Sequence, residues 1–199
     1  MALLTLLESV RFQEDIKKSR FLALAAPVDS AEQALQFFQE NSVADATHNC
    51  WAYKIGAQYR FNDDGEPGGT AGRPILQAIE GQDCDRVAVL VIRWFGGVKL
   101  GTGGLVRAYG GVAAQCLRLA DKRELVPMMR MRCRCAFGEL ALIQSRFETF
   151  AVQVQDEQFD SQGVVWTLAL PQDKSADFQQ AFINMTRGQG ECVPLQPVQ

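Results

Sequence analysis

The sequence predicts an α+β protein of two domains, and three observations support that prediction. Apolar residues recur with the period of strands in some segments and with the period of helices in others. The charged segment Asp121–Glu124 separates two such patterned regions. The length of 199 residues allows one large or two small domains, each able to bury a core. We therefore expect an N-terminal domain over residues 1–122 and a C-terminal domain over residues 126–199.

The first domain should contain alternating strands and helices. Ser30 followed by Gln33 has the spacing of a capping box, which predicts a helix that ends near Asn41. Pro74 suits the first turn of a short helix that ends before Gly81. The strands expected around these helices are Leu3–Phe12, Arg20–Val28, Cys50–Ala57 and Tyr59–Phe61, with Gln13–Ser19 as a charged turn.

The most informative stretch is a buried strand, a glycine-rich loop and a helix in succession. The apolar run Val87–Ile92 predicts the strand, and the loop Gly96–Gly104 follows it. The apolar residues after the loop have helical spacing: Leu105, Tyr109, Val112, Ala113, Cys116 and Leu117. Such a loop lets backbone N–H groups approach a ligand closely, and the start of a helix favours an anion.

This loop predicts a phosphate or nucleic-acid contact. Backbone N–H groups around Gly103 and Gly104 would be the donors, with the hydroxyl of Thr102 and the charges of Lys99 and Arg107 beside them. The glycine spacing matches neither the P-loop nor the dinucleotide-binding pattern. A tight turn that only packs a strand against a helix remains the alternative.

Polar residues that flank the earlier predicted strands Cys50–Ala57 and Tyr59–Phe61 are further candidates. His48, the single histidine, lies beside Asn49 and Cys50, so either a Cys–His nucleophile pair or a structural histidine that bonds a loop carbonyl is open. Oxygen ligands for a cation could come from three acidic residues, Asp63, Asp64 and Glu66, although turn-forming contacts explain them equally well. No catalytic residue, metal set or cofactor motif is identified.

The second domain should have the element order βαββαβ of a ferredoxin-like fold. Its expected elements are 126–137, 138–151, 152–159, 163–170, 175–187 and 191–195. In the first strand Met129, Met131, Cys133, Cys135 and Phe137 alternate with Met128, Arg130, Arg132 and Arg134. The three arginines could follow a nucleic-acid backbone or an acidic protein surface, or simply form the wet face of a sheet.

Composition limits the remaining choices. A net charge of −3 argues against a protein that holds duplex DNA by bulk charge. The six cysteines lack disulfide-framework spacing, and we expect reduced thiols in the cytoplasm. The N-terminus lacks the pattern of a signal peptide, and no apolar run approaches the ~20 residues that span a bilayer. We expect no membrane association and a monomer or weak homo-oligomer.

Three long segments resemble the YigZ/IMPACT family. They are DATHNCWAY at 45–53, FNDDGEPGGTAGRP at 61–74 and RWFGGVKLGTGGLVRAYGG at 93–111. The resemblance implies an N-terminal βα sandwich similar to domain IV of elongation factor G and a C-terminal domain similar to its domain V. It marks the segment Asp63–Pro74 as a second functional loop, which brings Arg73 into the predicted site.

The same resemblance implies a role in translation. RNA or the ribosome is the expected partner, with a protein of the translation machinery as a further possibility. Two other functions stay open on the residues alone: a protein or enzyme that binds a phosphorylated ligand in the loop Gly96–Gly104, and a protein-interaction module without nucleic acid.

Overall fold

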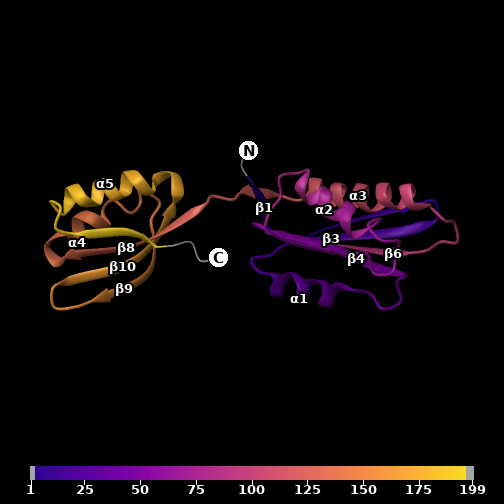
Figure 1. The fold of residues 1–199 in the computed structure, drawn as a ribbon, viewed down its shortest axis with the longest axis horizontal. Helices are drawn as coiled ribbons and strands as arrows, with labels where there is room; N and C mark the ends of the chain where they lie inside the picture. Colours follow the sequence, from indigo (N-terminus) through magenta and orange to yellow (C-terminus); the bar gives the residue numbers. More distant parts are fainter. Residues whose placement is uncertain (1–2, 196–199) are drawn as a thin grey trace. The chain divides into compact units, whose positions relative to one another are not determined.

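The computed structural model describes residues 3–195, and the chain divides after Leu125 into two compact units. Each unit has its own sheet, helices and core, so the predicted α+β class with two domains is confirmed (Figure 1). Segment Lys122–Glu124 forms strand β7, which pairs with β1 (Leu4–Leu6) at the end of the first unit. No helix within residues 3–195 is long and apolar enough to cross a membrane.

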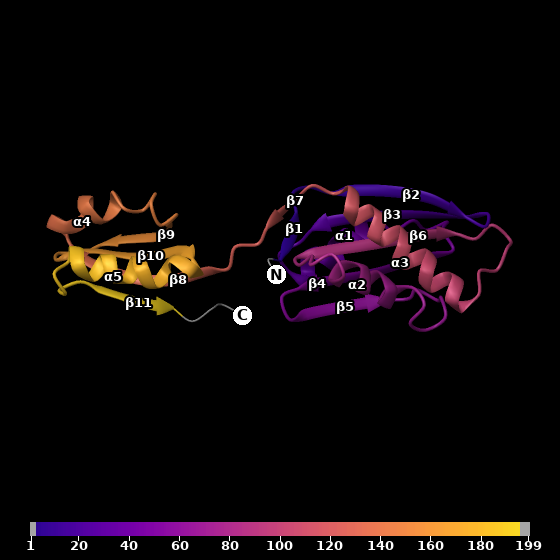
Figure 2. The same cartoon turned by 90° about the horizontal axis from the view of Figure 1, so that it is seen from above.

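The first unit is a five-stranded antiparallel sheet with helices on both faces. The strand order is β2-β3-β6-β4-β5. Helices α2 and α3 cover one face and α1 covers the other (Figures 1 and 2). The elements are β2 Val10–Ile16, β3 Ser19–Pro27, α1 Ala31–Asn41, β4 His48–Ile55, β5 Gln58–Asn62, α2 Gly72–Glu80, β6 Val87–Trp94 and α3 Thr102–Leu119.

The central strand β6 explains why the segment Val87–Ile92 is apolar on both sides. All six residues of this run are fully buried, because the strand lies between β3 and β4 with helices above and below it. The larger core, under α2 and α3, includes Tyr109, while the core under α1 includes Phe38 and Leu90. The predicted buried strand is therefore confirmed, and it ends at the glycine-rich loop.

The start of the chain differs from the sequence prediction. The expected strand Leu3–Phe12 is two strands, and the expected charged turn Gln13–Ser19 is mostly strand β2. The reversal occurs at Lys17 and Lys18 alone, which both have positive φ. A two-residue turn of this kind matches the twist of a hairpin. Since β2 is an edge strand, its charged residues can face water, and the charge pattern wrongly suggested a turn.

Helix α1 begins as the sequence predicts. The hydroxyl of Ser30 accepts a hydrogen bond from the backbone N–H of Gln33, with a donor–acceptor distance of 3.3 Å. The amide oxygen of Gln33 in turn accepts from the backbone N–H of Asp29 at 2.7 Å. The reciprocal bond thus reaches one residue earlier than in a standard capping box, and the helix still starts at Ala31.

The second unit is a four-stranded antiparallel sheet with the order β11-β8-β10-β9. Both helices pack on one face, as Figure 1 shows. The predicted order βαββαβ is confirmed by β8 Met128–Ala136, α4 Phe137–Gln144, β9 Gln153–Phe159, β10 Gly163–Pro171, α5 Ser175–Met185 and β11 Glu191–Leu195, with the short helix η1 at Gln172–Lys174.

The first helix of this unit is shorter than predicted. Helix α4 ends at Gln144, and turns follow as far as Ala151, which has a φ of +53° and is exposed. Phe147 and Phe150 in these turns still pack on the core, so apolar spacing alone did not reveal the end of the helix. Phe137 was predicted to belong to the same strand face as Cys133 and Cys135, but it begins α4 and is exposed.

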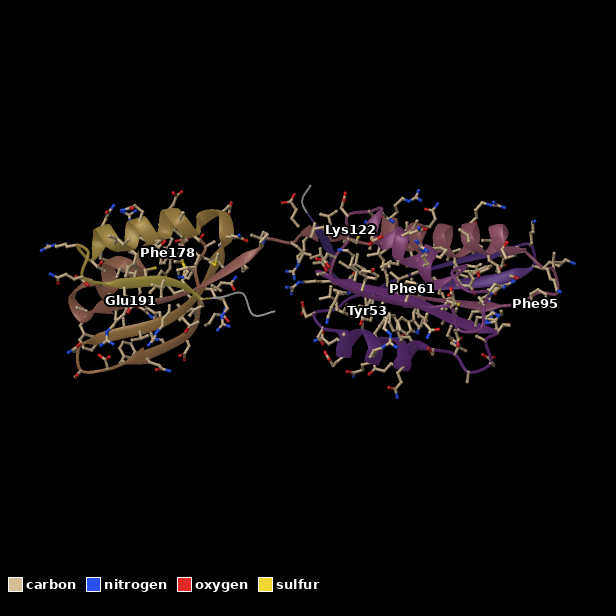
Figure 3. The ribbon with its side chains drawn as sticks, in the orientation of Figure 1. Tyr53, Phe61, Phe95, Lys122, Phe178 and Glu191 are labelled. Atoms are coloured by element: carbon tan, nitrogen blue, oxygen red, sulfur yellow. The ribbon has the colours of Figure 1, made fainter. Side chains whose placement is uncertain are left out.

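The predicted alternation along β8 is otherwise confirmed. Met131, Cys133 and Cys135 are buried under the helices, beside the labelled core residue Phe178 (Figure 3). The arginines of the strand occupy the open face of the sheet. All six cysteines of the chain are free and buried.

Candidate phosphate-binding cleft

A cleft of about 400 Å³ lies in the first unit where three segments far apart in sequence meet. One segment leads into β4, the second joins β5 to α2, and the third joins β6 to α3. The lining residues are Thr47, His48, Glu66, Pro67, Arg93, Phe95, Lys99, Leu100, Gly101, Thr102 and Leu105. The two glycine-rich loops that the resemblance singled out thus share this cleft.

The N-terminal end of α3 forms one wall of the cleft. Gly101 precedes the helix with a φ of +73°, a conformation that side chains other than glycine rarely adopt. No side chain caps this end, and the first helical hydrogen bond runs from the N–H of Leu105 to the carbonyl of Gly101. The N–H groups of Thr102, Gly103 and Gly104 precede that bond, so the helix itself offers them no acceptor. Together with the helix dipole, they favour an anion.

Positive charge and an aromatic ring stand beside this helix end. Lys99 and the hydroxyl of Thr102 line the cleft, and both residues are exposed. Phe95, on the loop that leads into α3, is 44% exposed (Figure 3). The guanidinium carbon of Arg93 lies 5.4 Å from the centre of the Phe95 ring. The wall can therefore meet both an anion and a flat apolar group.

The floor of the cleft is a buried polar network. Arg93 donates from Nη1 to the Glu66 carboxylate at 2.5 Å and from Nη2 to the Ser19 hydroxyl at 3.2 Å. Tyr109 donates from its hydroxyl to the same Glu66 oxygen at 2.7 Å. Burial raises the pKa of Tyr109 well above its ordinary value, so the hydroxyl remains a donor. The Arg93 Nε–H has no acceptor among residues 3–195.

His48 bonds a loop carbonyl, which is one of the two roles that the sequence left open for it. Its Nδ1 lies 2.7 Å from the carbonyl oxygen of Asp64, and because a carbonyl only accepts, Nδ1 is the donor. The Nε2 atom of the ring lies 3.7 Å from the Glu66 carboxylate on the cleft side. Burial raises the pKa of the Cys50 thiol to about 12, and the thiol faces the carbonyl of Asp63. His48 and Cys50 therefore bond different loop carbonyls, and no hydrogen bond joins the two side chains within residues 3–195.

The acidic candidates Asp63 and Asp64 accept hydrogen bonds from the backbone and so stabilise the loop between β5 and α2. Asp63 accepts hydrogen bonds from the backbone N–H groups of Gly69, Ala71 and Gly72, at 2.8, 3.0 and 2.8 Å. Asp64 accepts from the backbone of Asn49, whose amide is itself bonded to Val43 in both directions. Within residues 3–195 no group of three or more His, Cys, Asp or Glu side chains is arranged to hold a metal ion. Asp63, Asp64 and Asn49 are thus fixed by the backbone.

The remaining predicted residues lie outside the cleft lining. Arg107 is one turn further along α3, and its guanidinium lies close to Gly103 of the first turn. Arg73 lines a different hollow, between β5 and α2. The arginines of β8 belong to the second unit, where Arg134 is paired with Asp160 at 2.6 Å. Arg130 and Arg132 are exposed on the open face of that sheet.

Sequence reasoning missed the network under the cleft. Glu66 was proposed only as a possible oxygen ligand, Arg93 was named only within the family segment 93–111, and Tyr109 was assigned to the apolar face of the helix. One signal was present: Arg93 directly follows the apolar run, at a position where a charge needs a buried partner. That signal does not say which carboxylate is the partner, because Glu66 is 27 residues away in sequence.

Comparisons with known proteins find relatives for both units of the chain. Residues 17–117 match the family described as Impact N-terminal domain, and residues 133–189 match a domain of unknown function (DUF1949). An IMPACT family member encoded in the pol 5′ region of Thermus thermophilus is 47% identical over 174 residues, which cover 87% of this chain and 96% of the relative. The IMPACT family member YigZ of Escherichia coli is 34% identical over 190 residues, which cover 92% of this chain and 93% of the relative.

Two further comparisons define the extent of the likeness. A solved structure, described as the crystal structure of a hypothetical protein, superposes with a TM-score of 0.76 at 33% identity and covers 99% of both chains. The mouse protein IMPACT is 35% identical over 95 residues, which cover 43% of this chain and 29% of that protein. The likeness to the bacterial relatives therefore extends over both units, and the likeness to the mouse protein is partial.

Proposed function

We propose that this chain, which belongs to the IMPACT family, is an RNA-binding regulator of translation that holds RNA phosphate at the first turn of α3. The observation that carries the proposal is the cleft itself, where an uncapped helix end meets Lys99 and the exposed ring of Phe95. The partner class is RNA, either free or within the ribosome.

The charges around the cleft support an anionic ligand. Arg93 and Glu66 neutralise each other, which leaves Lys99 and the helix dipole as the net positive groups beside the opening. Arg107 adds a second cation near the first turn. Backbone donors and single cations of this kind position a phosphate backbone without reading its sequence. We therefore expect binding that depends on salt and only weakly on sequence.

RNA is preferred to a bare phosphate because of the apolar part of the wall. Phe95 is exposed beside the helix end, and an aromatic side chain can stack on an unpaired base. Base stacking and phosphate contacts together are the usual means by which proteins hold single strands.

A phosphorylated small molecule is the second candidate. The volume of about 400 Å³ lies within the ~300–1,000 Å³ typical of small-ligand pockets. Such a ligand should raise the melting temperature of the first unit, because binding only to the folded state stabilises it by mass action. A panel of nucleotides and sugar phosphates in a thermal-shift assay would reveal this outcome.

The decisive experiment compares charge variants in the loop before α3 and on α3 itself. Fluorescence anisotropy with a labelled single-stranded RNA should show weaker binding for Lys99→Ala and for Arg107→Ala. Each variant should reduce the slope of log affinity against log salt by about 0.7 for each lost phosphate contact. Arg118→Ala is the matched control, since Arg118 is an exposed arginine in the last turn of the same helix.

Both charge variants should fold normally, because exposed charges usually change stability by no more than ~0.5 kcal/mol. If the double variant Lys99→Ala, Arg107→Ala binds RNA as tightly as Arg118→Ala does, the loop only packs β6 against α3. The proposed RNA site would then be wrong. Arg130→Ala tests separately whether the second unit contributes to the same binding.

A further inference from the structure

A second hollow in the first unit, of about 390 Å³, lies between β5 and α2. Strand β5 contributes two aromatic residues, Tyr59 and Phe61, and α2 contributes Arg73 from its first turn. The rest of the lining comes from α2 and consists of Leu76, Gln77 and Glu80.

The aromatic rings of this groove are open to solvent. Tyr59 is 59% exposed and Phe61 is 38% exposed. They are two residues apart on one strand, so they face the same side at a spacing of about 7 Å. Strand β5 is the edge of its sheet and pairs only with β4 within the described chain. Two neighbouring rings on an edge strand thus form a flat, accessible apolar surface.

Arg73 supplies the positive charge of the groove, whose lining also includes the acidic residue Glu80. It is exposed, and no carboxylate within residues 3–195 lies within 4.0 Å of its guanidinium. The N-terminal end of α2 does not provide an anion site, because the Asp63 carboxylate already accepts the N–H of Gly72. A guanidinium that is free of ion pairs can bind a phosphate through two parallel hydrogen bonds.

The groove and the candidate cleft border the same short connection of the chain. Residues 63–71 join β5 to α2, and Glu66 and Pro67 of this connection line the cleft. Strand β5 and the start of α2, which border the groove, flank the same connection.

We propose that the groove of Tyr59, Phe61 and Arg73 binds single-stranded RNA, with bases on the two rings and a phosphate on the arginine. The inference rests on the RNA-binding function proposed above, and it names the substrate class as unpaired RNA. A ring needs a free base face, which a duplex does not offer because its bases are stacked on each other. Alternating aromatic and basic groups are the common design of single-strand grooves.

The test separates the groove from the cleft. Tyr59→Ala should weaken binding of a labelled single-stranded oligouridine by about 5- to 100-fold, the usual effect of removing one stacking ring. Tyr59→Phe keeps the ring and should bind like the wild type. Phe159→Ala is the matched control, because Phe159 is also 59% exposed but lies in the second unit. Binding of a blunt RNA duplex should be the same for Tyr59→Ala and the wild type.

Arg73→Ala should act differently from the ring variants. It should lower the salt slope by about 0.7, whereas Tyr59→Ala should leave the slope unchanged. Ultraviolet irradiation of the complex with oligouridine should crosslink a uridine to the peptide that contains Tyr59 and Phe61, as identified by mass spectrometry.

Three results would overturn the proposal. If Tyr59→Ala binds oligouridine like the wild type while Lys99→Ala binds weakly, the cleft stands and the groove is wrong. If the wild type binds no RNA, both proposals fail. If Tyr59→Ala instead abolishes a dimer seen by analytical ultracentrifugation and leaves RNA affinity unchanged, the edge strand β5 binds a second copy of the chain and not RNA.

Discussion

Replacing Arg93 with methionine should destabilise the first unit by about 3–5 kcal/mol, because it leaves the Glu66 carboxylate buried without its cation. The magnitude follows from the burial of the pair. The side chains of Arg93 and Glu66 are only 6% and 4% exposed, and the two groups are 2.5 Å apart. Water can therefore neither screen the charges nor replace the lost partner. The variant also loses the hydrogen bond to Ser19.

The assay is urea unfolding followed by tryptophan fluorescence. A Trp166→Phe background leaves Trp51 and Trp94, both in the first unit, as the remaining tryptophans. Unfolding free energies from this signal then report on the first unit alone. Arg86→Met is the control, because Arg86 pairs with Asp29 at the surface.

The Arg86–Asp29 distance is 3.0 Å and the two side chains are 50% and 76% exposed. The control variant Arg86→Met should therefore lower the unfolding free energy by no more than ~1 kcal/mol. The double variant Glu66→Gln, Arg93→Met should lose clearly less than the sum of its single variants, since it removes both charges together. A loss below about 1 kcal/mol for Arg93→Met, or strict additivity in the double variant, would refute the buried ion pair as a stabilising unit.

Three other predictions concern backbone, thiols and pH. Gly96→Ala should lower the unfolding free energy by more than about 2 kcal/mol, because the added Cβ would lie 1.7 Å from a backbone oxygen of the β2–β3 turn. Gly111→Ala, on the open side of α3, should raise the unfolding free energy by up to ~1 kcal/mol. Thermal unfolding measures both changes. Iodoacetamide at pH 8 should leave Cys50 unmodified in the native protein and label all six thiols after denaturation, since burial raises the pKa of Cys50 to about 12; rapid native labelling would contradict the burial. The N–H of Gln162 holds the pKa of Asp160 below its usual value, so its stabilisation is complete above an unfolded pKa of about 3.9 and disappears as the pH falls through the folded value. Asp160→Asn should therefore be less stable than the wild type at pH 6, and the two stabilities should converge near pH 2. Urea unfolding midpoints at the two pH values measure this difference.

Features that depend on contacts between neighbouring residues could be predicted from the sequence. The hydroxyl of Ser30 caps α1 because its partner, Gln33, is three residues away, and this contact needs no other part of the chain. The alternation along β8 sorted core residues from arginines because a strand has a fixed period of two. The edge strand β2 was the exception. Its charged residues suggested a turn, and only its place at the edge of the sheet explains how they can lie in a strand.

Only the tertiary structure decided which of the candidate residues share a site. Glu66 meets Arg93 and Tyr109, which are 27 and 43 residues away, because β6 and α3 pack side by side in one core. Arg73 follows the same glycine-rich loop as Glu66, yet it lines another hollow because α2 turns its first residues toward β5. Spacing along the chain could not distinguish these two outcomes. The directions in which the side chains of Glu66 and Arg73 point are set by long-range packing, and the local sequence does not encode them.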